Sequence, residues 1–227
     1  MKLMILSLVC SLIQILSVFH QPVAAKCLTT AEIDKRLLVF KARIGGEDVY
    51  QAKRPLLAAA KRSQACRQRV IRAVTSAMAQ LNDYSANREA YPLWHNGARL
   101  LSDLRAVEAL DLLTANLGFT DDFTISLTHY PAMLAVTAIG QPAIPKLELV
   151  LTKDPDPGIR KLAAWCIADI GGSRARSVLA KALLKEKDKC LNNFLRISLK
   201  MFANKTEPNH IPSDNGEWWA AFYCPAE

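Results

Sequence analysis

Apolar residues recur at helical spacing over most of this chain. The clearest stretch lies between residues 159 and 170, where apolar side chains fall at relative positions 0, 3, 4, 7, 8 and 11. That spacing places them on one face of a helix, which such a pattern predicts to be buried. No alternating apolar and polar run of strand length competes with this interpretation. The sequence therefore predicts an all-α fold.

One pattern occurs twice. An apolar helix, an Ile-Gly pair and a second apolar helix appear around residues 139–140 and again around 170–171, 31 residues later. After a one-residue insertion the following leucines also align, Leu147 and Leu151 with Leu179 and Leu183. A period of this size with paired helices is typical of a helical solenoid, in which each pair buries its apolar face against the next.

The repeated residues resemble a known family. Residues 154–160 read Asp-Pro-Asp-Pro-Gly-Ile-Arg and residues 163–171 read Ala-Ala-Trp-Cys-Ile-Ala-Asp-Ile-Gly. This motif resembles the short bacterial HEAT repeats called PBS-lyase-like, most clearly over 131–184 and more weakly over about 94–203. The resemblance implies a short solenoid of stacked antiparallel helix pairs with a concave face. It also implies a packing or turn-bridging role for Arg160.

Four segments are expected along the chain. Residues 1–25 have a basic start, an apolar run and the small residues Val-Ala-Ala at 23–25, which predict a cleaved signal peptide. An uncleaved membrane anchor is the alternative, because the apolar run is near the lower length limit for a span. A basic helical segment (26–90), the repeat solenoid (91–203) and a C-terminal tail or cap helix (204–227) follow. We therefore expect an exported protein, periplasmic or secreted, with no transmembrane segment after cleavage.

The basic character is confined to the N-terminal segment. Residues 26–80 contain twelve Lys or Arg and four Asp or Glu. A helix is predicted to begin after Thr29, and a longer basic helix to run from about residue 55 to 81. These basic side chains either form a solvent-exposed helix face or attract an anionic envelope surface, lipid or polysaccharide. We expect no nucleic-acid partner, because no aromatic residues alternate with the basic ones.

Five cysteines remain after signal cleavage, and disulfides persist in exported proteins. Cys166 falls at a core position of a helix and is expected to stay free. Cys27 with Cys66 and Cys190 with Cys224 are then the economical pairs, although other connectivities remain open from the sequence.

No catalytic motif is present, and the histidines His95, His129 and His210 lie far apart, without metal-ligand spacing. We therefore expect no enzyme, no cofactor and no bound metal.

The favoured function is a non-enzymatic scaffold that holds a protein or peptide partner along the concave face. Arg160, Lys161 and Trp165 lie off the apolar stripe and are the candidate binding surface. Two alternatives stay open: an envelope-surface binder acting through the basic segment, and an enzyme subunit. A deep pocket with converging polar groups would favour the enzyme subunit.

Overall fold

The computed structural model describes residues 27–81, 87–120 and 130–203. Helices joined by short connections make up these ranges, and no strand occurs in them, so the all-α prediction is confirmed. The predicted signal peptide (1–25) and the predicted C-terminal cap (204–227) lie outside the described residues.

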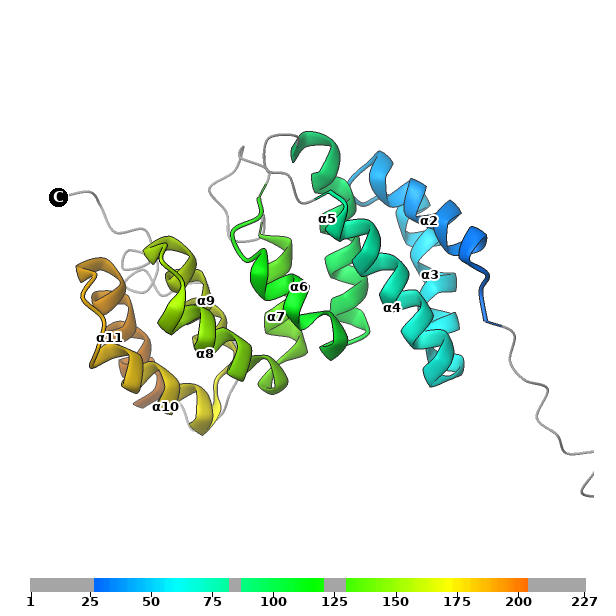
Figure 1. Cartoon of the computed structure of the whole chain (residues 1–227). Helices are drawn as coiled ribbons and strands as arrows, with labels where there is room; N and C mark the ends of the chain where they lie inside the picture. Colours follow the sequence, from blue (N-terminus) through cyan, green and yellow to red (C-terminus); the bar gives the residue numbers. More distant parts are fainter. Residues whose placement is uncertain (1–26, 82–86, 121–129, 204–227) are drawn as a thin grey trace, which may run out of the picture.

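The helices follow one another from one end of the molecule to the other, so that the described part is solenoid-like (Figure 1). In chain order they are α2 (Thr30–Ala42), α3 (Glu47–Arg62), α4 (Gln64–Ala79), α5 (Asn87–Asp103), η2 (Val107–Ala109), α6 (Leu110–Ala115), α7 (Pro131–Ile139), η4 (Gln141–Ala143), α8 (Ile144–Lys153), α9 (Pro157–Ile170), α10 (Gly172–Leu183) and α11 (Lys189–Ala203).

The two copies of the repeated pattern make the same turn. Gly140 ends α7 with φ 82°, and its amide donates to the carbonyl of Val136 at 3.2 Å. Gly171 ends α9 with φ 71°, and its amide donates to the carbonyl of Ile167 at 3.1 Å. Positive φ favours glycine, which explains why the Ile-Gly pair recurs. The side-chain amide of Gln141 donates to the carbonyl of Gly171 at 2.8 Å and links the two turns.

Helix α9 begins with a capped first turn. The Asp156 carboxylate accepts a hydrogen bond from the amide of Gly158 at 2.7 Å, and Pro157 occupies the first helical position. The predicted stripe is buried along its centre, at Leu162, Ala163, Cys166 and Ile167. Burial on this scale stabilises a helix by roughly 1.5–3 kcal/mol for each large apolar side chain.

The predicted helix from 55 to 81 is wrong, because the chain forms α3 and α4 with a break between them. Ser63 adopts an extended backbone conformation, and its hydroxyl accepts a hydrogen bond from the amide of Cys66 at 3.2 Å. Serine is a favoured residue for starting a helix in this way. Pro55 lies inside α3 rather than at a helix start. The apolar periodicity did not reveal the break, since it spans a single residue.

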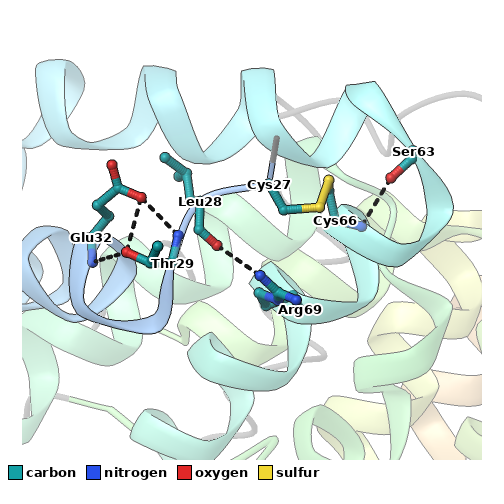
Figure 2. Close-up of a disulfide and its surroundings, with 7 residues drawn as sticks. All are labelled: Cys27, Leu28, Thr29, Glu32, Ser63, Cys66 and Arg69. Carbon is teal, nitrogen blue, oxygen red and sulfur yellow. Dashed lines mark hydrogen bonds between the residues drawn. A yellow bond between two sulfur atoms is a disulfide. The ribbon is translucent and has the colours of Figure 1, made fainter. Parts of the chain in front are cut away.

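A disulfide between Cys27 and Cys66 fixes the N-terminal end of the described chain, and that predicted pair is confirmed (Figure 2). It joins the residues before α2 to the first turn of α4. Close by, the Arg69 guanidinium donates to the carbonyl of Leu28 at 3.2 Å. The start of the described residues is therefore held to α4 by one covalent bond and one hydrogen bond.

The start of α2 matches its prediction as well. The Thr29 hydroxyl accepts from the amide of Glu32 at 3.2 Å, and the Glu32 carboxylate accepts from the amide of Thr29 at 2.7 Å. This reciprocal pair satisfies two amides at the helix start, as Figure 2 shows.

Helix α5 joins the three N-terminal helices to the repeats. The Asn96 side chain is only 3% exposed, and its amide group donates to the carbonyls of Phe40 at 3.1 Å and Arg43 at 2.7 Å. Its oxygen accepts from the amide of Gly45 at 3.4 Å. One side chain thus satisfies the carbonyls at the end of α2 and the turn that follows.

The apolar core is continuous across this junction, from Ile33 in α2 to Leu195 in α11. Trp94 of α5 is fully buried and stacks on Phe119 with ring centroids 4.8 Å apart. Since α5 begins at Asn87, the predicted segment boundary at residue 90 falls inside a helix. The basic segment and the repeats therefore share one core.

None of the described helices alone has the length and apolar composition of a membrane span. Helices α7 and α8, joined through η4, reach that length and apolar composition only together, and the pair is bent by 111°.

Replacing both Cys27 and Cys66 by serine should lower the free energy of unfolding by about 4 kcal/mol, the loop-closure value for a closed loop of this size. The disulfide spans 39 residues of sequence. Urea unfolding of the disulfide-bonded protein and of the variant measures the effect. A double variant with the wild-type midpoint would contradict it.

Asn96→Ala should lower the free energy of unfolding by about 2 kcal/mol, because it leaves buried carbonyls without a donor. Asn193→Ala removes an amide side chain from an exposed position on α11 and serves as the control. We expect that control to stay within about 0.5 kcal/mol of the wild type. Equal effects in the two variants would refute the junction role of Asn96.

Candidate functional site

Arg160, predicted as a surface position, holds two turns together. Its guanidinium donates to the carbonyls of Asp154 at 3.1 Å and Pro155 at 3.2 Å, in the turn before α9. It also forms a two-point pair with the Glu186 carboxylate, at 3.2 and 2.9 Å, in the turn between α10 and α11. The side chain is only 16% exposed. These contacts agree with the expected turn-bridging role. They leave little of the Arg160 side chain accessible to a partner.

Trp165 does not lie on a surface, and its prediction as a binding position is corrected. Its side chain is 8% exposed. The spacing argument assumed one free face on α9, but α9 contacts α7, α8, α10 and α11. A helix surrounded by four neighbours buries residues off its main apolar stripe as well.

Lys161 is half-buried near the start of α11, with its ammonium nitrogen 3.7 Å from the sulfur of Cys190. Burial lowers the pKa of Lys161, and the charge of Asp188 opposes that shift. Cys190 is disulfide-bonded, and its partner lies outside the described residues, so the pairing with Cys224 stays a prediction.

Cys166 is free and fully buried, as predicted. Burial raises the pKa of its thiol far above the ordinary value, which keeps the thiol protonated. A protonated, enclosed thiol is a poor nucleophile, so Cys166 behaves as a core residue.

Glu186 is the acceptor at the centre of the Arg160 network. Burial works toward a raised pKa, but hydrogen bonds from Arg160 and from the amides of Asp188 and Lys187 outweigh it, and the charge of Arg160 adds to them. The pKa of Glu186 therefore lies below its ordinary value, and the ionised carboxylate stabilises the fold.

A hollow lies elsewhere, where α3, α5 and α7 meet. It has a volume of about 340 Å³, and we call it the α5 cleft. Its lining residues are Lys53, His95, Ala98, Arg99, Ser102, Asp103, Pro131, Leu134 and Ala135.

The polar wall of the α5 cleft comes mainly from one face of α5. His95, Arg99 and Ser102 are spaced by four and three residues, which places them one above another on a helix. Lys53 reaches the cleft from α3, and its ammonium lies 2.8 Å from the Asp103 carboxylate. Charged and polar groups from two helices thus converge on one hollow.

Two neighbours hold this wall in place. The His95 ring lies against the buried ring of Tyr91, with centroids 5.9 Å apart. At the end of α5, the Arg67 guanidinium donates to the carbonyls of Leu104 at 2.8 Å and Arg105 at 3.4 Å. Carbonyls at a helix end carry partial negative charge, so Arg67 offsets that charge next to the cleft.

The opposite wall is apolar and begins at the first turn of α7. Pro131, the first residue of α7, and Ala135 are buried, while Leu134 is half-buried. The start of a helix carries partial positive charge. The residue before α7, Tyr130, provides no side-chain hydrogen bond to that start. The cleft therefore combines an apolar wall with a positive electrostatic bias.

This arrangement suits binding better than nucleophilic catalysis. Ser102 and His95 are seven residues apart on α5, a rise of about 10 Å, whereas an activated serine needs its base within about 3 Å. Within residues 27–81, 87–120 and 130–203, no three His, Cys, Asp or Glu side chains gather closely enough to hold a metal ion.

Sequence reasoning missed the α5 cleft, although half of its signal was present. The spacing of His95, Arg99 and Ser102 marks a polar helix face and could have been noticed. Lys53 and the α7 wall could not, because only the packing of three helices brings them to that face.

Comparison with known proteins gives a partial match. No family model matches the chain, and no solved structure matches it. The epoxyqueuosine reductases of Bacillus anthracis and Bacillus cereus are each 37% identical to it over 65 residues. That stretch is 29% of this chain and 17% of each reductase, so the chain covers a small part of these relatives.

This match corrects the functional prediction. A non-enzymatic scaffold for a protein or peptide, with an envelope-surface binder as its alternative, was expected. The proteins that share the matched stretch are, by name, reductases and therefore enzymes. The expectation that this chain is not itself an enzyme stays a prediction.

Glu186→Gln should lower the free energy of unfolding at pH 7 by about 2 kcal/mol, the scale of a hydrogen bond to a charged group. Because folding lowers the pKa of Glu186, its contribution is complete above the unfolded value near 4.3 and is lost as the pH falls through the folded value. The gap between variant and wild type should therefore close in acid.

Denaturant unfolding between pH 7 and pH 2 measures this gap. Glu148→Gln makes the same change on α8, outside the Arg160 network, and is the control. A gap that stays constant with pH would show that the Glu186 charge does not stabilise the fold.

Proposed function

We propose that this chain is a ligand-binding helical module of an enzyme, and that the α5 cleft holds the ligand. The observation that carries the proposal is the cleft itself, where polar groups from α3 and α5 converge opposite an apolar wall of α7. Its volume of about 340 Å³ falls within the range of small-molecule sites, roughly 300–1,000 Å³.

The partial match supports the enzyme context. The similar stretch forms 17% of each reductase, which fits a module contributing to an enzyme more than a complete reductase. The protein partner proposed for the chain is then the catalytic subunit. The spacing of Ser102 and His95 supports the same division, because it favours binding over chemistry within the cleft.

Two further expectations remain proposals. The repeated glycine turns at Gly140 and Gly171 support the resemblance to HEAT repeats. The Cys27–Cys66 disulfide supports export to the periplasm or beyond, because disulfides persist mainly in oxidising compartments.

The test is whether the cleft retains a small molecule. The mature chain is incubated with the small-molecule fraction of the cells that make it, separated by gel filtration, and analysed by mass spectrometry. Ser102→Phe places a ring in the cleft, and Ser177→Phe makes the same change at an exposed position of α10.

The wild type and Ser177→Phe should retain the same compound, and Ser102→Phe should lose it, with all three chains showing the same helical spectrum. Retention that is equal in all three variants, or absent from the wild type, would overturn the proposal.

A further inference from the structure

We infer that the ligand of the α5 cleft is a small amphiphilic anion. Its oxyanion head, a phosphate or a carboxylate, lies between Lys53 and Arg99, and its short apolar body lies along α7. Asp103 competes with that head for Lys53 and thereby limits the affinity. The inference rests on the proposed function in placing the ligand in this cleft, and it adds the ligand's charge and orientation.

The charges of the cleft favour an anion. Lys53 and Arg99 are cationic, and Asp103 is the one carboxylate among the described residues of the lining. Lys53 is paired with Asp103 at 2.8 Å, whereas none of the described residues forms an ion pair with Arg99. Arg99 can therefore form a two-point contact with an oxyanion without first breaking an ion pair.

The first turn of α7 adds to this bias. Its amides lie at the positive end of the helix dipole, and the cleft is lined by Pro131 at that end. The cationic side chains of α3 and α5 supply the independent second source of positive potential. Both sources act on the same hollow, which is why a neutral or cationic ligand fits less well.

The apolar lining determines what kind of body the ligand carries besides its anionic head. Ala98, Pro131, Leu134 and Ala135 form a patch of small and medium side chains beside the polar wall. A body about the size of one ring or a branched alkyl group covers this patch, and its burial contributes to binding. Inorganic phosphate alone would leave the patch exposed and should bind more weakly.

Substitution of Asp103 distinguishes an anionic ligand from a cationic one. Its carboxylate holds the Lys53 ammonium and lies on the same wall as Arg99. Removing its charge frees Lys53 and removes a repulsion, so anion binding should tighten. Removing the charge of Arg99 or Lys53 should have the opposite effect. A cationic ligand would reverse both signs.

The experiment measures binding of defined probes to the full mature chain by titration calorimetry. The probes are phenyl phosphate, benzoate, inorganic phosphate and the neutral benzyl alcohol. The variants are Arg99→Gln, Lys53→Gln and Asp103→Asn, with Arg176→Gln on α10 as a charge-matched control outside the cleft.

Phenyl phosphate or benzoate should bind the wild type more tightly than inorganic phosphate and benzyl alcohol do. Arg99→Gln should weaken that binding about tenfold, the scale of one charge-assisted hydrogen bond, and Lys53→Gln should weaken it too. Asp103→Asn should tighten it about threefold, Arg176→Gln should leave it unchanged, and added salt should weaken it.

Asp103 also links α5 to α3, so Asp103→Asn could fold poorly. A second pair of variants tests the same charge effect without removing that link. Ser102→Asp and Ser102→Lys place opposite charges on the same wall, and they should weaken and tighten phenyl phosphate binding, respectively. Signs opposite to these, or tighter binding of benzyl alcohol than of either anion, would overturn the inference.

The two proposals fail separately. If the cleft retains a cellular compound that is neutral or cationic, the proposed function holds and the anionic ligand class is wrong. If the anionic probes bind with the predicted signs and no cellular compound is retained, the ligand class holds and the proposed function is wrong.

Discussion

The burial of α5 is the constraint on which the rest of the structure depends. Helix α5 carries Trp94, fully buried, and Asn96, which satisfies the carbonyls at the end of α2. A buried amide with its hydrogen bonds made fixes the position of a helix, because leaving those carbonyls unsatisfied would be costly. With α5 fixed, α2 packs on one side and α7 on the other, and the N-terminal helices continue the row that the repeats form.

The repeats are held together at their turns as well as by their apolar faces. Gly140 and Gly171 make the same helix end, and Gln141 joins one turn to the next. Arg160 of α9 likewise donates to the carbonyl of Asp154, in the turn before α9, and to the Glu186 carboxylate, in the turn before α11. Hydrogen bonds of this kind satisfy helix-end carbonyls that apolar packing leaves unsatisfied. The bonds of Arg160 also occupy one residue that was expected to bind a partner.

The α5 cleft arises from the same packing. The outer face of α5 meets α3 and the start of α7, and none of the three helices alone would form a hollow. The basic N-terminal segment therefore contributes Lys53 to the cleft. In the function proposed above, the cleft binds and orients a ligand, while the reacting groups come from another part of the enzyme.

Several features were determined by the sequence alone. Periodic apolar spacing predicted the all-α fold and the α9 stripe, the Ile-Gly pairs predicted the repeated turn, and a helix start was predicted after Thr29. Each of these depends on residues close together in the chain, where backbone geometry fixes the outcome. The Cys27–Cys66 pair was also predicted, by assigning Cys166 to the core.

Only the tertiary structure decided the remaining features. Trp165 is buried because four helices surround α9, and the break at Ser63 follows from α3 and α4 packing against each other. The α5 cleft brings Lys53 to Asp103 across 50 residues of sequence. Apolar periodicity reports which face of a helix is buried. It does not report which neighbours cover that face, and those neighbours determine where a cleft forms.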